Sequence, residues 1–324
     1  MDCQFWGCTL EVLERAEDHL LCRMPCAGGG SGLMDRWPLF PGIELLFCDF
    51  NAQTCFSQVE ARPNVLEFNH CRRGRYECRF ENQTYAYLGP GEVAVNTLDH
   101  LQQWSGFPLG EYAGLSLMID LDQAEAFWAA APCLAPDLSA IRGRLWGGLH
   151  YVQAPARGPL AQCLEGLYQD LPRESRLPVY RLRVLELLEL LRTMPLEKHA
   201  LRAYLPREKR ERMDLVRAAL EQDREGRLTL PQLARAHGMG VSALKEQFLA
   251  VYGLPPMTFR SQCRMRRAAR LLTHTELSVA EIAGRLGYEN ASKFSAAFRR
   301  TTGEAPALYR KNHAAERSAH GPAE

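Results

Sequence analysis

The sequence LTLPQLA at residues 228–234 is matched 49 residues later by LSVAEIA at residues 277–283. After one inserted residue the correspondence resumes at a spacing of 50 residues. It matches Leu244 with Phe294, Phe248 with Phe298, Gly253 with Gly303 and Pro256 with Pro306. A repeat of this kind indicates two copies of one supersecondary unit. The C-terminal third of the chain is therefore predicted to contain two similar units.

Each copy opens with the signature of a helix start. Thr229 with Gln232, and Ser278 with Glu281, have the spacing of a capping box, in which the hydroxyl accepts a hydrogen bond from an otherwise unpaired helix N–H group while the residue three positions later reaches back. We expect a short helix to follow each box, with its apolar residues on one face.

Each short helix is followed by a glycine, Gly238 or Gly287, which suits a left-handed helix cap. A second helix is then predicted over residues 241–251 and again over residues 291–300, with inward-facing apolar residues four positions apart. A short helix, a tight turn and a second helix form a helix-turn-helix, whose second helix can lie in the major groove of DNA. The alternative is a helical pair packed for structure or for protein contact.

Charge is unevenly distributed along the chain. Residues 207–312 contain 20 Lys and Arg against 11 Asp and Glu, a net charge of +9, whereas residues 1–206 contain 18 against 25, a net charge of −7. A basic segment attracts phosphates whatever the base sequence, so we expect DNA to contact the C-terminal part and not the acidic part.

The motifs of the two units follow one another in a specific order. They are Leu230-x-x-Leu233-Ala234-x-x-x-Gly238, Leu244-x-x-x-Phe248, Tyr252-Gly253, Arg264-x-x-x-Ala268-x-x-Leu271-Leu272, Ile282-Ala283-x-x-x-Gly287-Tyr288, Phe294-Ser295-x-x-Phe298-Arg299 and Gly303-x-x-Pro306-x-x-Tyr309-Arg310. This order resembles the DNA-binding domain of the AraC/XylS family of bacterial transcription regulators. The resemblance implies a seven-helix domain in which a helix at residues 256–273 joins two units, whose recognition helices enter successive major-groove segments about 34 Å apart.

The outward positions of the two second helices are candidates for DNA contact. They are Ser242, Ala243, Lys245, Glu246, Ser292, Lys293, Ser295, Ala296, Arg299 and Arg300. We expect the four basic side chains to hold phosphates, and Ser242, Glu246 and Ser292 to meet base edges, where glutamate accepts a hydrogen bond from cytosine. Many relatives place arginine or glutamine where this chain has Glu246 and Ala296, so strong bidentate recognition of guanine is in doubt.

Residues 43–121 carry the signals of short strands. Strands are predicted over residues 43–50, 54–60, 65–71, 75–80, 84–88, 92–96 and 114–120, and helices over residues 121–131, 137–147, 160–171 and 179–194. Many short strands separated by turn formers predict an antiparallel barrel or two-sheet jelly roll, so the whole chain is expected to be α+β. The last of these helices is rich in leucine and is either core or a dimer contact.

In AraC-type regulators a cupin-like barrel of this sort is the usual effector-binding module, and the helices after it carry dimerisation. Candidate effector-binding residues on the strands are Asn69, Arg72, Arg75, Glu77, Arg79, Tyr85 and Tyr87. The arginines could cradle an anionic small molecule, although a solvated sheet face is the alternative. Residues 68–77 are similar to sensor domains of the siderophore-regulator subgroup, which suggests an iron-siderophore effector.

A metal or thiol site is the other possibility in the N-terminal half. Cys3, Cys8, Cys22 and Cys26, with His19 nearby, are candidates to surround a cation or sense redox state, but buried thiols acting as small apolar groups are the commoner outcome. The odd total of 11 cysteines argues against a disulfide framework. The barrel stretch offers only His70, with His100 just beyond it, and cupin enzymes need more ligands. We therefore expect no metal, no cofactor and no enzymatic activity.

The 324 residues are expected to form two domains. The predicted parts are an N-terminal helical segment (Thr9–Leu21) with a glycine-rich connector in residues 1–42, an effector-binding and dimerisation domain in residues 43–194, a linker in residues 195–211, the DNA-binding domain in residues 212–312, and a flexible tail in residues 313–324. The sequence has no run of 18 apolar residues, and its acidic segment at residues 11–18 is unlike a secretory signal. These features predict a cytoplasmic protein without membrane contact.

Together these features predict a sequence-specific transcription regulator that binds double-stranded DNA as a homodimer under the control of a small-molecule effector. Resemblance favours an activator, which would also contact RNA polymerase. The alternatives are a DNA-repair protein of the alkyl-acceptor type, which would need a tight zinc-thiolate cluster, a thiol or metal sensor, and a non-specific architectural DNA-binding protein.

Overall fold

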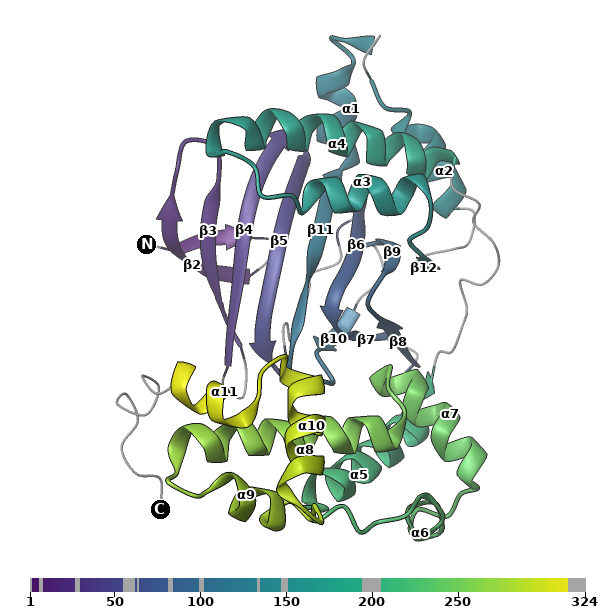
Figure 1. Cartoon of the computed structure of the whole chain (residues 1–324). Coiled ribbons are helices and arrows are strands. Elements are labelled where there is room, and N and C mark those ends of the chain that lie inside the picture. The colour runs from purple at the N-terminus through teal and green to yellow at the C-terminus, as the bar shows by residue number, and fades with distance from the viewer. Residues whose placement is uncertain are drawn as a thin grey trace. The chain divides into compact units, whose positions relative to one another are not determined.

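The computed structural model of the chain describes residues 2–5, 8–26, 30–54, 62, 64–80, 84–98, 102–132, 135–146, 151–193 and 205–313. The chain divides into two compact units, residues 1–207 and residues 208–324 (Figure 1). The first combines β-sheets with helices, and the second is helical. The predicted α+β class is therefore confirmed.

Two antiparallel sheets form the framework of the N-terminal unit. The larger has the strand order β1 (Asp2–Phe5), β2 (Cys8–Arg15), β3 (Leu20–Pro25), β4 (Gly30–Phe40), β5 (Ile43–Ala52), β11 (Tyr112–Asp120), β6 (Val65–Gly74), β9 (Glu92–Thr97) and β12 (Tyr151–Pro155). The smaller has the order β10 (Gln102–Gly106), β7 (Tyr76–Phe80), β8 (Thr84–Leu88) and β13 (Leu205–Pro206). The strand predicted over residues 54–60 lies mostly outside the described residues.

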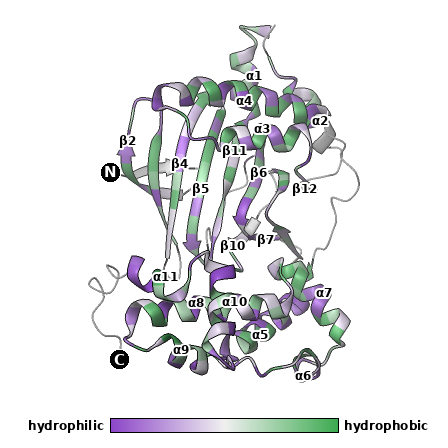
Figure 2. Cartoon of the chain, in the orientation of Figure 1, coloured by the Kyte–Doolittle hydropathy of each residue, from purple (hydrophilic) through white to green (hydrophobic). Residues whose placement is uncertain are grey.

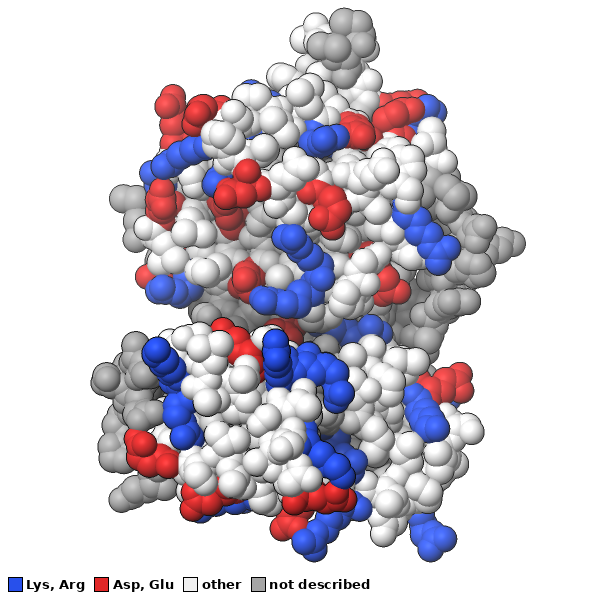
Figure 3. Space-filling view, in the orientation of Figure 1, with Lys and Arg blue, Asp and Glu red and all other residues white. Residues whose placement is uncertain are grey.

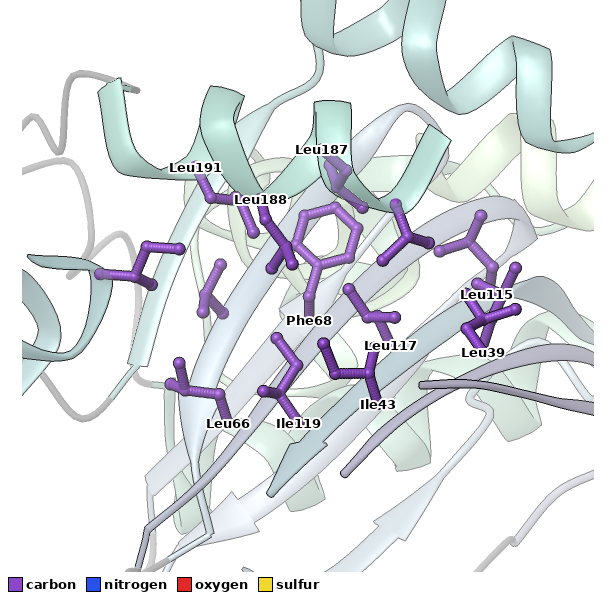
Figure 4. Packing of buried hydrophobic residues seen from close by; sticks show 14 of the residues in the cluster. Leu39, Ile43, Leu66, Phe68, Leu115, Leu117, Ile119, Leu187, Leu188 and Leu191 are labelled. Atoms are coloured by element: carbon purple, nitrogen blue, oxygen red, sulfur yellow. The ribbon is translucent and has the colours of Figure 1, made fainter. Parts of the chain in front are cut away.

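Helices cover one face of the larger sheet. They are α1 (Leu121–Trp128), α2 (Leu138–Trp146), α3 (Pro159–Leu167) and α4 (Arg173–Thr193), and Figure 1 shows α3 and α4 running across the strands. Leu187, Leu188 and Leu191 project from α4 toward side chains of the sheet such as Phe68 and Leu117 (Figure 4). The leucine-rich helix therefore belongs to the core, although Leu182 on its outer face is 68% exposed.

Strand alternation gives this unit two separate cores. On β5, Ile43 and Leu45 belong to the core under the helices, while Leu46, Cys48 and Phe50 belong to a second core with residues of the smaller sheet such as Cys78 and Leu88. Since successive side chains point to opposite faces, a strand buried on both faces carries a nearly continuous apolar run.

The helix predicted over residues 9–21 is wrong, because this segment forms β2 and β3. The burial pattern of β2 has period two: Leu10 and Val12 are covered, whereas Thr9 and Glu11 are exposed. Leucine and glutamate favour helices intrinsically, but pairing with a neighbouring strand overrides such preferences. Of the predicted glycine-rich connector, residues 30–32 begin β4 and residues 27–29 lie outside the described part.

The C-terminal unit consists of seven described helices, as the resemblance implied. They are α5 (Arg207–Gln222), α6 (Leu230–Ala236), α7 (Val241–Tyr252), α8 (Pro256–His274), α9 (Val279–Arg285), α10 (Ala291–Thr302) and α11 (Pro306–Asn312). Hydrophobic and hydrophilic residues alternate along these ribbons in Figure 2, as expected for amphipathic helices.

The predicted linker at residues 195–211 extends too far, because α5 already begins at Arg207. Residues 195–204 and the predicted tail beyond His313 lie outside the described residues. No helix in the described part of the chain has the length and apolar character needed to cross a membrane.

Candidate nucleic-acid interface

The first helix-turn-helix is formed by α6 and α7. Thr229 Oγ1 accepts a hydrogen bond from the backbone N–H of Gln232, and Gln232 Oε1 accepts one from the backbone N–H of Thr229, at 3.4 and 3.0 Å. Gly238 turns the chain with a φ of +63°, and Gly253 ends α7 in the left-handed conformation. The predicted capping box and glycine turn are thus confirmed in this unit.

The second unit repeats this geometry with α9 and α10. Ser278 and Glu281 form the capping box through hydrogen bonds of 3.2 and 2.7 Å. Hydrogen bonds from the side chain and the backbone N–H of Ser278 to the Glu281 carboxyl lower its pKa, because they favour its charged form. Asn290 adds a cap that sequence reasoning missed, since its Oδ1 accepts a hydrogen bond of 2.8 Å from the backbone N–H of Lys293 at the start of α10.

Aromatic packing fixes each second helix against the helix that follows it. The ring of Phe248 on α7 lies 5.5 Å from that of Phe259 on α8, edge to face. The ring of Phe298 on α10 lies 5.3 Å from that of Tyr309 on α11 in the same arrangement. Phe248 and Phe298 are fully buried, so the inner faces of α7 and α10 pack in the core and their outer faces are left for other contacts.

Two arginines at equivalent positions of the repeat hold the segments that lead into the short helices. Arg260 Nη1 donates a hydrogen bond of 2.6 Å to the carbonyl oxygen of Leu228, and Arg310 Nη2 donates one of 2.5 Å to that of Leu277. A third, Arg264, donates to the carbonyl oxygen of Leu286 and lies over the ring of Tyr288. Part of the basic excess is therefore structural, which charge counting along the sequence does not reveal.

The residues predicted to contact DNA lie on the outer faces of α7 and α10. Exposed among them are Ser242, Lys245, Glu246, Ser292, Lys293, Ala296, Arg299 and Arg300, and half-buried are Ala243 and Ser295. Leu249 also lies on the outer face of α7 and is 47% exposed. Sequence reasoning missed it, although the spacing of seven residues from Ser242 places the two on one stripe of the helix.

Basic side chains on this unit are partly balanced by acidic ones. Lys293 Nζ forms an exposed ion pair with Glu289 one helical turn earlier, and this hydrogen bond lowers the pKa of Glu289. Figure 3 shows Lys and Arg spread over the visible face of the C-terminal unit with Asp and Glu among them. A phosphate approaching Lys293 would therefore compete with a carboxylate.

The residues predicted to bind an effector fall in three places. The first surrounds Asn69, whose Oδ1 accepts a hydrogen bond of 2.6 Å from Ser116 and whose Nδ2 lies 3.5 Å from Asn96 Oδ1. Asn96 in turn donates to Glu67 over 2.8 Å. Burial raises the pKa of Glu67 although the hydrogen bonds from Asn96 and Asn69 oppose the shift. This polar group shares its sheet face with apolar residues that pack between the two sheets.

The second place lies on the opposite face of the larger sheet. Arg72 lies over the ring of Tyr168, 4.4 Å from its centroid, and both border a groove of about 270 Å³ with Leu33 and Phe47. Next to it, His70 Nδ1 is 2.9 Å from the Tyr168 hydroxyl, and burial, followed by the charge of Arg72, lowers the pKa of His70 to about 4. His70 is thus a hydrogen-bonded sheet residue, whereas His100 lies outside the described residues.

The third place is on β7 and β8. Glu77 pairs with Tyr87 across the strands and accepts a hydrogen bond of 3.0 Å from its hydroxyl, while Arg79 pairs with Tyr85. Arg75 lies 5.2 Å from the centroid of the Tyr87 ring. The candidates from Arg75 onward are therefore neighbours, but the structure does not join them with Asn69 or Arg72 into one site.

Most described cysteines lie in the apolar cores. Cys22, Cys48, Cys71 and Cys78 belong to the core between the sheets, and burial raises the pKa of Cys48 and Cys71 to about 12. Such thiols stay protonated and act as small apolar groups. Among the described residues there is no group of three or more side chains placed to hold a metal ion. The side chains of Cys3 and Cys8 lie outside that set.

Comparison with known proteins gives a family match within the C-terminal unit. A family model described as a helix-turn-helix domain matches residues 233–312. The chain is 40% identical over 85 residues to the uncharacterized HTH-type transcriptional regulator YdiP of Escherichia coli, covering 26% of this chain and 28% of that protein. It is 29% identical over 152 residues to the HTH-type transcriptional regulator ExsA of Pseudomonas aeruginosa, covering 47% of this chain and 54% of that protein.

The chain is also 36% identical over 105 residues to the transcriptional activator NphR of Rhodococcus, covering 32% of this chain and 31% of that protein. The matched stretches therefore span between about a quarter and about half of these relatives. Among solved structures, the DNA-binding domain of AdpA in complex with a target DNA matches at 28% identity, with 33% of this chain and 97% of that chain covered and a TM-score of 0.31.

Proposed function

We propose that this chain, which belongs to the AraC/XylS family through its C-terminal helix-turn-helix domain, is a sequence-specific DNA-binding transcription regulator. The observation that carries the proposal is the pair of capped units whose second helices commit one face to the core and leave a polar face exposed. Two such helices joined by α8 are suited to two short half-sites on one side of the duplex.

The exposed residues divide by chemistry into two roles. Lys245, Lys293, Arg299 and Arg300 would hold phosphates and set the position of the domain on the duplex without reading sequence. Ser242, Glu246 and Ser292 would contact base edges, with the carboxylate of Glu246 accepting a hydrogen bond from a cytosine amino group. The half-buried Ala243 and Ser295 and the exposed Ala296 would then allow close approach to the groove.

A genome-wide map of DNA bound by the intact chain in its host tests the regulator proposal. We expect sharp peaks that share two short half-sites about one helical turn apart. Diffuse occupancy without a shared sequence would contradict it and favour the architectural alternative, which binds phosphates only. Relatives named as activators, NphR and the virulence regulon activator VirF of Yersinia enterocolitica, support activation as the outcome at the bound promoters, with RNA polymerase as a partner.

We also propose that the N-terminal unit binds a small-molecule effector. The polar group formed by Glu67, Asn69, Asn96 and Ser116 supports this, because a few convergent polar groups among apolar side chains are typical of ligand sites. The Asn69→Leu variant should keep its affinity for promoter DNA in vitro but change how a reporter responds to growth conditions. An unchanged reporter response across conditions would contradict an effector site at this position.

Homodimer formation is a further proposal for the N-terminal unit. Six of the seven leucines of α4 are buried in the core under the helices or packed against it, so the exposed Leu182 is the residue of this helix best placed to contact a second copy. Sedimentation of the full chain should show a dimer that Leu182→Glu weakens. A monomer at all concentrations would contradict the dimer, and an unchanged dimer would place its interface elsewhere.

A further inference from the structure

The outer faces of the two second helices differ at equivalent positions of the repeat. Because the spacing in this region is 50 residues, Ser242 corresponds to Ser292, and Leu249 corresponds to Arg299. Both members of the second pair are exposed in the structure. The two units therefore present different chemistry at the same place on the same kind of helix.

This difference changes the charge of each helix. The outer face of α10 carries Lys293, Arg299 and Arg300, with Glu289 just before the helix. The outer face of α7 carries one positive and one negative side chain, Lys245 and Glu246. Because positive side chains attract DNA phosphates, α10 should contribute more of the sequence-independent affinity for DNA, and α7 should contribute little.

Leu249 lies on the stripe of α7 that holds the other candidate base contacts. It follows Glu246 by three residues and Ser242 by seven, which puts all three on one side of the helix. Leu244 and Phe248, by contrast, are fully buried on the other side. Leu249 therefore does not belong to the core of the unit, since 47% of its surface is exposed.

We propose that Leu249 determines sequence specificity by packing against the C5-methyl group of a thymine in the half-site bound by α7. The proposal rests on the regulator function proposed above. Among the four bases, only thymine presents an apolar group in the major groove, so an exposed leucine on a recognition helix fits thymine. Glu246, one turn earlier, would accept from a cytosine close to that thymine.

The test uses DNA chosen by the protein itself. Sequences are selected from a random duplex pool with the full chain, and each thymine of the selected site is then replaced singly by uracil, which removes only the methyl group. Dissociation constants are measured by fluorescence anisotropy at a fixed salt concentration. For wild type, uracil at one position of the first half-site should weaken binding about four-fold, the value of one buried methyl-sized group.

Three variants separate the role of Leu249 from general effects. Leu249→Ala should bind the thymine and uracil sites equally, because the methyl group has lost its partner. Leu308→Ala removes a leucine of similar exposure on α11, at 49%, and should keep the four-fold difference. Leu249→Arg copies the residue of the second unit, so it should bind unselected DNA more tightly and add about 0.9 to the slope of log affinity against log salt.

The outcomes separate this inference from the function on which it rests. If no common sequence is selected, both the regulator proposal and this inference fail. If a common sequence emerges but no uracil in the first half-site weakens binding, or if Leu249→Ala keeps the difference, only the role of Leu249 is overturned. Loss of the difference in Leu308→Ala as well would overturn it too, because the effect would not be specific to the recognition helix.

Discussion

A side chain at Gly287 would collide with Glu225: a Cβ atom built there lies 2.0 Å from the Glu225 carbonyl oxygen. Gly238, its equivalent in the first unit, has a similar φ but no atom within 4 Å of such a Cβ. Both glycines adopt the left-handed conformation, so alanine at either carries a conformational cost of about 1–2 kcal/mol. Only at Gly287 is a steric clash added.

We therefore predict that Gly287→Ala destabilises the C-terminal unit clearly more than Gly238→Ala. Denaturant unfolding of each full-length variant, followed by the loss of helical circular dichroism, gives the two free energies of unfolding. Equal losses would show that the contact with Glu225 relaxes without cost. Valine at either position should be worse than alanine, because β-branched residues tolerate positive φ poorly.

Arg260 and Arg310, which donate hydrogen bonds to the segments that lead into α6 and α9, should stabilise the C-terminal unit. Arg310→Ala removes the hydrogen bonds to the carbonyl oxygens of Leu272 and Leu277 and should cost about 2 kcal/mol of unfolding free energy, typical of bonds from a charged donor. Arg310→Lys should recover little of the stability that Arg310→Ala loses, because an ammonium group lacks the planar fork of donors that a guanidinium offers. Arg300→Ala is the matched control: this exposed residue should leave stability within about 0.5 kcal/mol and weaken DNA binding.

The ion pair between Glu289 and Lys293 leads to a prediction about salt dependence. Lys293→Ala should weaken binding to all DNA sequences and reduce the slope of log affinity against log salt by about 0.9. Glu289→Gln should strengthen binding to all sequences, because it releases Lys293 from its carboxylate partner. Salt titrations of both variants against wild type provide the measurement, and equal slopes in wild type and Lys293→Ala would contradict the phosphate role.

Asp223 should make the stability of the C-terminal unit depend on pH. Burial raises its pKa, but hydrogen bonds from the backbone N–H groups of Arg227 and Leu228 and from Arg260 outweigh this effect and lower the pKa below its usual value. A lowered pKa in the folded state means that the stabilisation is complete above the unfolded pKa of about 4 and is lost as pH falls through the folded value.

Asp223→Asn should therefore destabilise the protein at pH 7 and differ progressively less from wild type toward pH 2. Thermal unfolding at a series of pH values measures both curves. A constant difference across that range would indicate that the carboxylate charge is not what Arg227, Leu228 and Arg260 stabilise.

The sequence predicted the C-terminal unit well because its signals are local. Capping boxes, glycine turns and apolar residues four positions apart each act within one or two helical turns, so α7, α8 and α10 end within two residues of their predicted bounds. The exposure of Leu249 was missed because a leucine at helical spacing is expected to lie in the core. The roles of Arg260 and Arg310 were missed because their partners are backbone carbonyl groups distant in sequence.

Prediction was less successful in the N-terminal unit, where pairing decides the structure. Strands such as β5, β8 and β9 were found from their β-branched and aromatic residues and flanking turns. β2 and β3 were predicted as helix, since helix-favouring residues dominate there and only the neighbouring strands make them extended. The division of the effector candidates among three places depends on which face each strand turns inward, and mixed polar and apolar residues leave that undetermined.

The strand order of the larger sheet has a consequence for the order of folding. β11 lies between β5 and β6, so the centre of this sheet cannot form until the ribosome has released β6 to β10 and then β11 itself. Until then β5 presents an unpaired edge, which is a site where nascent chains associate wrongly. The helical unit, built from contacts between neighbouring segments, needs no such wait. Expression of this protein should therefore be limited by how long β5 remains without its central partner.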